Sequence, residues 1–222
     1  MADNRFPVAP FRDAGYEIVT AGEGGQGGVA MAAKAEMVDV VQGIPGAEPP
    51  LAERRTISAT VGPLRIHTVY APNGRKVGTP AHRVKLAWLA LFAAWVGMDG
   101  LSDGMPTVVT GDLNLAPADI DIWAPERYRK RNLTSPPERA AFQALLDAGL
   151  VDVVRQSHPD TALYTWWNRR GDFYESDRGW RLDHVLADPV TAAAADKIWI
   201  DREERGRKGA SDHAPVVADF QF

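Results

Sequence analysis

Three features of this sequence predict an α/β fold. The 222 residues include 20 Gly and 16 Pro, above average usage, which indicates many turns between short elements. Runs of β-branched or alternating residues lie between these turns and predict strands along the whole chain. Two stretches instead repeat apolar residues at helical spacing. Strands interspersed with helices are typical of α/β proteins and argue against a plain helical bundle.

The composition excludes several classes of protein. With 45% hydrophobic and 24% charged residues, the chain can bury a core and is neither disordered nor fibrous. It has no Cys, which excludes disulfides and a cysteine zinc site. The longest apolar stretch, residues 86–98, is shorter than the roughly 20 residues of a membrane span. The first residues lack the apolar region of a signal peptide. We therefore expect a soluble, cytoplasmic protein with no membrane partner.

The first third of the chain predicts a short helix and a β-hairpin. Residues 7–14 form one or two helical turns that Gly15 ends. Strands are expected at residues 16–20 and 28–33, on either side of the glycine-rich segment 22–28. A phosphate-binding loop would place such glycines at the start of a helix, with Lys-Ser or Lys-Thr behind them. Because this segment leads into a strand instead, we interpret it as a hairpin turn or a mobile loop.

A second hairpin and two helices follow. Residues 55–61 and 64–70 alternate in polarity around Gly62-Pro63, and a loop follows at 70–74. Thr79-Pro80 supplies a cap and a first-turn proline for a helix. The apolar face of that helix is predicted to contain Leu86, Trp88, Leu89, Phe92, Ala93, Trp95 and Val96. A capping box that begins at Ser135 starts another helix, which ends near Gly149.

Acidic residues follow or begin three of the predicted strands. The β-branched strand from Met105 breaks at Gly111 and presents Asp112 and Asn114, which as residues two apart share one face. The strand ends of α/β folds commonly carry the chemistry. The competing interpretation is an Asp that caps the following turn, which would be the preferred one for an isolated Gly-Asp.

The predicted strand 180–187 places Asp183 inside a sheet. An unpaired buried carboxylate costs several kcal/mol, so Asp183 needs a partner. The partner is either Arg181, expected on the same face, or a histidine elsewhere in the chain. His184 is interpreted as an ordinary half-buried histidine, on the face shared by Leu182 and Leu186.

Asp212 and His213 stand directly before the last predicted strand. As an isolated dipeptide they would more often form a turn than a catalytic pair. Three acidic strand ends in one chain, however, favour a shared site. Asp and Asn oxygens suit Mg²⁺ or Mn²⁺, and a carboxylate-oriented His beside such a metal can cleave a phosphate ester. The residues alone therefore predict metal-assisted phosphodiester hydrolysis.

Five motifs together resemble one known family, and they occur in that family's order over nearly all of the chain. They are Tyr70-Ala71-Pro72-Asn73-Gly74, Gly111-Asp112-Leu113-Asn114, Trp166-Trp167, Gly179-Trp180-Arg181-Leu182-Asp183 and Ser211-Asp212-His213. The family is the exonuclease III type of apurinic/apyrimidinic endonuclease, within the endonuclease/exonuclease/phosphatase superfamily. The segments Asp119-Ile120-Asp121-Ile122 and Arg129-Lys130-Arg131 are similar to its bacterial branch.

The resemblance implies a fold and an activity. The fold would be a four-layered α-β-β-α sandwich of two mixed sheets flanked by helices, in one domain over residues 1–222. The activity would be that of a monomeric DNA-repair nuclease dependent on Mg²⁺ or Mn²⁺. It would cut double-stranded DNA at abasic sites and remove nucleotides from 3′ ends.

The resemblance also implies five catalytic residues. Asp112 would activate the attacking water, and Asn114 would help to hold the water and the phosphate. Tyr70 would lie against the scissile phosphate. Asp183 would orient His213. Asp212 would bind the metal, with Asp112 and Asn114 near enough to share it.

Five further residues are implied to bind substrate. Trp166, Trp180 and Leu182 resemble a wall that accepts an extrahelical abasic sugar, because a missing base leaves nothing to unstack. Asn73 would contact the phosphate or the catalytic Asp. Arg129, in a run of basic residues, would contact backbone phosphates. The competing interpretations are aromatic core for the tryptophans and a solvated loop for the basic run.

The chain departs from the family at its front. A strand-helix-strand unit of roughly 30–40 residues, with an active-site Asn and a metal-binding Glu, precedes the segment that matches residues 1–7 in the family. We expect that this N-terminal shortening reflects a start codon placed too far downstream or a truncated form, with a naturally shortened protein as the alternative. Low or no nuclease activity is expected, with restoration when the upstream codons are included.

Two other functions are weighed against the nuclease. One is a small-molecule or lipid phosphoesterase of the same superfamily, since the Gly-Asp-x-Asn and Ser-Asp-His motifs are shared with such enzymes. The other is a catalytically dead relative that still binds DNA. The tryptophans and the basic run favour DNA over small phosphate esters.

Overall fold

The computed structural model describes residues 6–23 and 26–222. Its helices are α1 (Val8–Asp13), α2 (Pro80–Met98), α3 (Pro125–Tyr128), α4 (Pro136–Asp147), α5 (Val153–Ser157), α6 (Pro189–Ala193) and α7 (Arg202–Gly206), with a 3₁₀ turn at Asp119–Asp121. Its strands are β1 (Glu17–Glu23), β2 (Gln26–Ala33), β3 (Met37–Gln42), β4 (Thr56–Val61), β5 (Leu64–Tyr70), β6 (Thr107–Asp112), β7 (Val151–Asp152), β8 (Trp166–Trp167), β9 (Gly179–Trp180), β10 (Asp183–Ala187), β11 (Ala195–Ile200) and β12 (Val216–Phe220).

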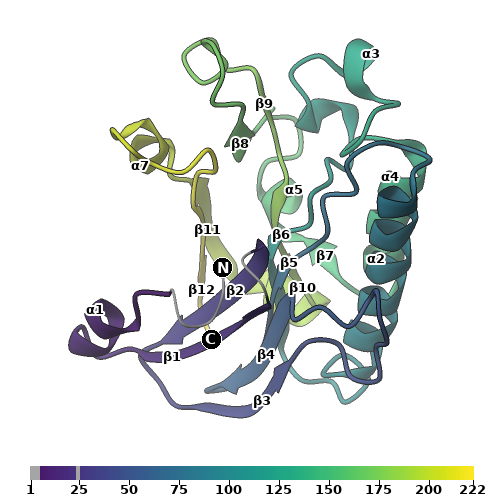
Figure 1. Cartoon of the computed structure of the whole chain (residues 1–222). Helices are drawn as coiled ribbons and strands as arrows, with labels where there is room; N and C mark the ends of the chain where they lie inside the picture. Colours follow the sequence, from purple (N-terminus) through teal and green to yellow (C-terminus); the bar gives the residue numbers. More distant parts are fainter. Residues whose placement is uncertain (1–5, 24–25) are drawn as a thin grey trace.

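A six-stranded mixed sheet forms the centre of the molecule (Figure 1). Its strand order is β3-β4-β5-β6-β10-β7. Strands β5 and β6 are parallel, and every other neighbouring pair is antiparallel. The predicted hairpin of β4 and β5 turns at Gly62, whose φ of 56° suits glycine.

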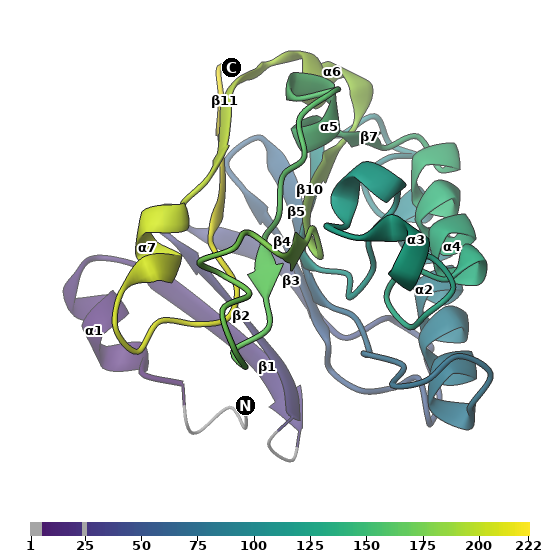
Figure 2. The same cartoon turned by 90° about the horizontal axis from the view of Figure 1, so that it is seen from above.

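Helices α2 and α4 cover one face of this sheet (Figures 1 and 2). The predicted face of α2 is buried except for the half-buried Leu86, with Trp88, Phe92 and Trp95 packed among sheet residues such as Val69 and Val109. Thr79 caps α2 as predicted, because its hydroxyl accepts a hydrogen bond from the His82 backbone N–H (3.4 Å). The capping box of α4 is also present. Both predicted helices are confirmed.

Two separate strand pairs cover the other face of the sheet. The β1–β2 hairpin packs its Ala21 and Met31 on Ile57 and Ala59 of β4. The β11–β12 pair packs around β10 and α5. Figure 2 shows both pairs on the side of the sheet opposite α2 and α4. The α/β class with a mixed sheet and flanking helices is confirmed. The second β layer differs from the expected single mixed sheet, because the described strands form two antiparallel pairs.

The predicted strand 180–187 is two elements. Residues Gly179–Trp180 pair with Trp166–Trp167, and the sheet strand begins only at Asp183. Arg181 lies between them and points into a buried carboxylate cluster, so the predicted shared face of Arg181 and Asp183 is wrong. His184 is fully buried instead of half-buried.

Gly111 is required by the close approach of β5 to β6. Its φ is 131°, and a Cβ there would lie 2.1 Å from the Val69 carbonyl oxygen. We expect Gly111→Ala to destabilise the protein by more than about 3 kcal/mol, since main-chain atoms on both strands must move. Gly149→Ala is the matched control, because Gly149 has a φ of 109° but open space around it. Urea denaturation measures both. Equal losses in the two variants would refute the steric explanation.

Candidate active site

Three neighbouring strands bring the predicted catalytic residues together. Tyr70 at the end of β5 lies in register with Asp112 at the end of β6, and Asp112 lies in register with Asp183 at the start of β10. Parallel strands end at the same edge of a sheet, and an antiparallel neighbour begins there. All three side chains therefore lie at one edge of the sheet, although 113 residues of sequence separate Tyr70 from Asp183.

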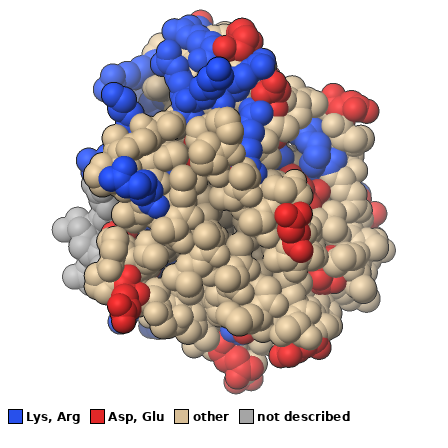
Figure 3. Space-filling model, turned by 90° about the vertical axis from the view of Figure 1, so that its right-hand side faces the viewer, with Lys and Arg blue, Asp and Glu red and all other residues tan. Residues whose placement is uncertain are grey.

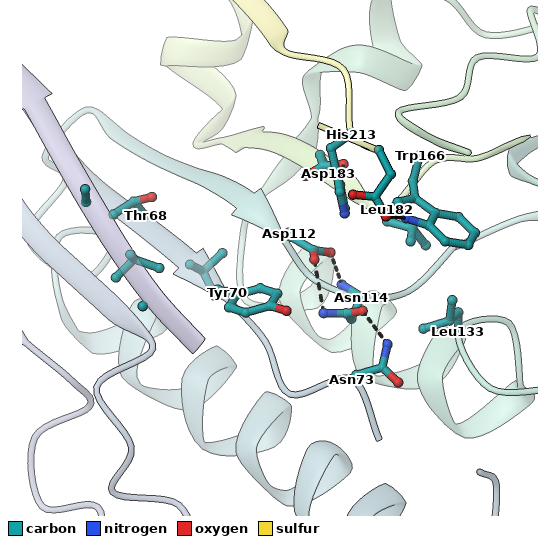
Figure 4. A pocket seen from close by; sticks show the side chains of 15 residues that line it. Thr68, Tyr70, Asn73, Asp112, Asn114, Leu133, Trp166, Leu182, Asp183 and His213 are labelled. Atoms are coloured by element: carbon teal, nitrogen blue, oxygen red, sulfur yellow. Dashed lines mark hydrogen bonds and ion pairs between the residues drawn. The ribbon is translucent and has the colours of Figure 1, made fainter. Parts of the chain in front are cut away.

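These residues open into a cavity of about 670 Å³ (Figure 4). The cavity is lined by Gly28, Val29, Ala30, Thr68, Val69, Tyr70, Asn73, Asp112, Asn114, Leu133, Trp166, Leu182, Asp183, Asp212 and His213. Nine of the eleven residues predicted to form the site line this cavity, and the other two, Trp180 and Arg129, lie outside it.

The partner of Asp183 is His213. The His213 Nδ1 lies 2.8 Å from the Asp183 Oδ2. Burial by itself would lower the pKa of His213, but the hydrogen bond and charge of Asp183, together with Asp112 and Asp212, raise it to about 9. The ring is therefore a cation at neutral pH, and its Nδ1–H donates to Asp183. This pairing leaves the other ring nitrogen, Nε2, to contact a ligand.

Asp112, Asn114 and Asn73 form a hydrogen-bonded chain across the cavity floor (Figure 4). The Asp112 carboxylate accepts from the Asn114 backbone N–H (2.7 Å) and side-chain Nδ2 (3.1 Å). The Asn114 Oδ1 accepts from the Asn73 Nδ2 (2.9 Å). Asn73 thus contacts Asn114 and not Asp112. Asp112 and Asn114 were expected to share one face of a strand, but the strand ends at Asp112. Asn114 lies in the turn that follows, with a φ of 53°, and this turn brings its side chain back to Asp112.

The electrostatics bring the pKa of Asp112 close to neutral pH, so that its carboxyl group can both accept and release a proton there. Burial and the charge of Asp183 raise the pKa of Asp112 to about 7, against the opposing charges of His213 and Lys85. Burial and the Asp112 charge also raise the pKa of Tyr70. Closely spaced carboxylates with shifted pKa values are typical of sites that transfer protons or bind cations.

Asp212 lies at the rim of the cavity with both oxygens engaged. Its Oδ2 accepts from the Trp166 indole N–H (3.0 Å), and its Oδ1 lies 3.4 Å from the Arg169 Nε. Burial would raise the pKa of Asp212, but the Trp166 hydrogen bond and neighbouring cations lower it. Asp212 is thus held as a carboxylate beside Asp112, Asn114 and His213.

The two tryptophans of the predicted wall lie side by side, with their ring centroids 5.2 Å apart. Trp166 lines the cavity, whereas Trp180 does not. Both line an adjoining cleft of about 640 Å³, together with Tyr128, Phe173 and several basic residues. Trp167 is fully buried, as its core interpretation implies.

Arg129 lies away from the cavity. It follows α3 and lies 3.4 Å from Asp119, in a shallow groove with Arg127, Lys130 and Arg131. Figure 3 shows Lys and Arg side chains gathered at the end of the molecule that carries α3, above a broad uncharged surface. A protein with a net charge of −4 therefore still presents a concentrated basic surface, part of which lines the cleft that adjoins the cavity.

A buried cluster behind the site was not predicted. Arg181 donates to Asp121 (2.7 Å) and Asp152 (2.8 Å), and its Nη1 lies 3.1 Å from the His184 Nδ1. The His184 Nε2 lies 3.0 Å from the Leu115 carbonyl oxygen. Nε2 therefore carries the proton and Nδ1 accepts from Arg181. The cluster holds the chain in place immediately before Asp183.

This cluster predicts a pH dependence of stability. Burial and the charge of Arg181 lower the pKa of His184 to about 4, against about 6.5 in an unfolded chain. Below pH 6.5 the unfolded state binds a proton that the folded state does not. The free energy of unfolding should fall by up to about 1.4 kcal/mol per pH unit between pH 6.5 and 4. Urea denaturation should show this slope reduced in His184→Gln. Identical slopes in both proteins would contradict the assignment.

Fold and site together define a class of protein: an α/β hydrolytic enzyme that gathers a carboxylate, a carboxamide and a carboxylate-bound histidine at neighbouring strand ends. The sequence model of the Endonuclease/Exonuclease/phosphatase family matches residues 2–213. Exodeoxyribonuclease III of Haemophilus influenzae is 31% identical over 235 aligned residues, covering all of this chain and 86% of that protein.

Two solved structures match equally well in fold. A 3′ phosphatase, NExo from Neisseria, bound to a product DNA hairpin, is 36% identical with a TM-score of 0.94. An AP endonuclease from Archaeoglobus fulgidus is 32% identical with the same TM-score. Both matches cover all of this chain and 86% of the other. The chain belongs to the Endonuclease/Exonuclease/phosphatase family, and within it to the exonuclease III type.

The enzyme prediction, an exodeoxyribonuclease III-like hydrolase, is confirmed at the level of this family. Among the described residues, no helix combines the length and apolarity needed to cross a bilayer.

Proposed function

We propose that this chain is a DNA-repair nuclease that hydrolyses phosphodiester bonds at abasic sites and at 3′ ends. The observation that carries the proposal is the His213–Asp183 pair, 2.8 Å long, facing the Asp112–Asn114 pair across one cavity. The names of the relatives support it: an exodeoxyribonuclease III, an AP endonuclease and a 3′ phosphatase bound to DNA.

The chain's own residues divide the work of hydrolysis. Asp112, with a pKa of about 7, takes the proton of the attacking water, and Asn114 helps to position that water. His213 is held as a cation by Asp183 and directs Nε2 at a phosphate oxygen, where it stabilises developing negative charge. The Tyr70 hydroxyl lies at the same edge and contacts the scissile phosphate.

The donor set fits Mg²⁺ or Mn²⁺. Asp112, Asn114 and Asp212 offer carboxylate and amide oxygens at one cavity, the ligands that these hard cations prefer. Within residues 6–23 and 26–222, no group of three or more His, Asp or Glu could hold a metal alone. When bound, the cation would neutralise charge on the phosphate.

Substrate binding is proposed for residues around the rim. Trp166 and Leu182 line the cavity, and Trp180 stands behind Trp166, so the three could enclose a sugar that carries no base. Asn73 would contact phosphate through its carboxamide. Arg129 and its basic neighbours would contact backbone phosphates of double-stranded DNA. We also propose that the protein is a monomer that acts in the cytoplasm.

A substrate panel tests the proposal. Duplexes with an abasic site or a recessed 3′ end should be cleaved, with enzyme in excess so that slow turnover is detected. Addition of EDTA should stop cleavage, and Mg²⁺ should restore it. Cleavage of inositol or lipid phosphates but not DNA would favour the small-molecule phosphoesterase. A salt-dependent gel shift without any cleavage would favour the catalytically dead DNA-binding relative.

A further inference from the structure

We propose that Lys85 and Glu138, a buried ion pair beneath the cavity, are positioning residues for the active site. The pair would hold the main chain of two loops so that the Asn73 and Asn114 carboxamides meet beside Asp112. This inference rests on the proposed function. Neither residue lines the cavity, and neither belongs to a motif that the sequence analysis assigned to the site.

Lys85 joins three segments through one ammonium group. It extends from α2, and its side chain is fully buried. The Lys85 Nζ donates to the Asn114 carbonyl oxygen at 2.6 Å and lies 3.4 Å from the Asn73 carbonyl oxygen. It also forms a close ion pair with the Glu138 Oε1. The loop after β5, the loop after β6 and the start of α4 therefore converge on a single cation.

Glu138 is fixed in turn by four donors. Its Oε1 accepts from Lys85 and from the Leu133 backbone N–H (3.0 Å). Its Oε2 accepts from the backbone N–H (3.0 Å) and the hydroxyl (2.6 Å) of Ser135. A buried ion pair offsets its desolvation only when its remaining hydrogen-bonding positions are satisfied, as they are here. The ammonium is consequently held at one point with little freedom to move.

The backbone conformation at Asn114 explains why the position of the Lys85 ammonium matters. Asn114 has a φ of 53°, in the left-handed region that asparagine tolerates better than most residues other than glycine. Its carbonyl oxygen is held by Lys85, while its side chain bonds Asp112 and the Ala71 carbonyl oxygen (2.9 Å). If the Asn114 peptide turned, its carboxamide would leave Asp112.

The loop that carries Asn73 is packed on the same lysine. A Cβ added at Gly74 would lie 2.7 Å from the Lys85 Cδ, and Gly74 has a φ of 80°. The Asn73 carboxamide then reaches the Asn114 Oδ1 at 2.9 Å (Figure 4). Two carboxamides that touch inside the cavity are thus anchored to one ammonium outside it.

The test compares Lys85→Met with a control pair at the opposite end of the same elements. Arg65 of β5 pairs with Asp99 after α2 (2.8 Å), away from the cavity-lining residues. Both Lys85→Met and Arg65→Met remove a buried cation and lower the melting temperature. Only Lys85→Met should lower kcat on an abasic-site duplex, by about 10²-fold for a shift of about 1 Å in the carboxamides, with KM unchanged.

A double variant separates positioning from stability. Lys85→Met with Glu138→Gln removes both charges, so that no buried charge is left unpaired, and keeps a carboxamide oxygen that can accept from the Leu133 or Ser135 backbone N–H. We expect the melting temperature to recover and kcat to stay low, because methionine cannot donate to the Asn114 carbonyl. Recovery of kcat together with the melting temperature would overturn the inference.

A measurement independent of activity keeps the inference apart from the proposed function. In ¹H–¹⁵N spectra, the side-chain amide resonances of Asn73 and Asn114 should shift or broaden in Lys85→Met and in the double variant, and stay in place in Arg65→Met. Unchanged amide resonances in the double variant would overturn the positioning role. Absence of DNA cleavage by the unsubstituted chain, with the amide shifts observed, would instead count against the nuclease function alone.

Discussion

The His213→Ala substitution is expected to abolish cleavage of an abasic-site duplex, with a loss of at least about 10⁴-fold in kcat. His213 lines the cavity as a cation, because its hydrogen bond to Asp183 raises its pKa to about 9. Alanine removes both the charge and the ring nitrogen that would contact the phosphate. Single-turnover cleavage of a labelled duplex measures the effect.

His158→Ala is the matched control for this substitution. His158 is half-buried and contacts the Ile198 carbonyl oxygen (2.9 Å), away from the cavity, so its loss should leave the rate intact. Retained cleavage by His213→Ala would show that His213 is not a catalytic residue and would contradict the proposed active site. The same loss is expected for Asp112→Ala, because no other cavity-lining carboxylate is bonded to Asn114.

The Asp183→Asn substitution is expected to lower kcat on the order of 10⁴-fold while the protein stays folded. The shape of the side chain is retained, but the carboxamide cannot stabilise a charged imidazole or fix which nitrogen carries the proton. KM should change little, because Asp183 acts through His213 and not on the substrate.

An NMR titration provides a second measurement of this effect. In metal-free protein the pKa of His213 should fall in Asp183→Asn, since burial then outweighs the remaining favourable charges. A full rate with an unchanged His213 pKa would show that Asp183 does not orient the ring.

Local sequence signals predicted the elements that carry the site. Strand β6 is a β-branched run that breaks at Gly111, and α2 and α4 begin with recognisable caps, so their boundaries could be found from a few neighbouring residues. Strand β3 was not predicted. It is an edge strand with Val38 and Val40 exposed and Asp39 at a φ of 51°, so it lacks the regular alternation that identifies a strand.

Partners distant in sequence could not be predicted from spacing. Lys85 lies on the apolar face of α2, where a charged residue breaks the apolar pattern without indicating a partner. Its ion-pair partner, Glu138, is 53 residues away in the sequence. Arg181 was offered as a partner for Asp183, but its carboxylates, Asp121 and Asp152, come from two other segments. Only the three-dimensional arrangement shows which charge neutralises which.

The division of the second β layer into two strand pairs could not be predicted either, because it also depends on contacts between segments distant in sequence. The sequence predicts strands where β1, β2 and β12 lie, but pairing between strands depends on which edges meet in space. The glycine-rich segment between β1 and β2 behaves as a hairpin connection in the described residues, and Gly24 and Gly25 within it lie outside them.

The in-register alignment of Tyr70, Asp112 and Asp183 makes the site vulnerable to a particular kind of mutation. Successive side chains of a strand point to opposite faces of the sheet. Deletion of a single residue inside β6 would therefore turn Asp112 toward the face covered by helices, while Tyr70 and Asp183 would stay on the face of the cavity. Insertions in the connecting loops would not have this consequence. In evolution, then, the lengths of β5, β6 and β10 should drift far less than the lengths of the segments that join them.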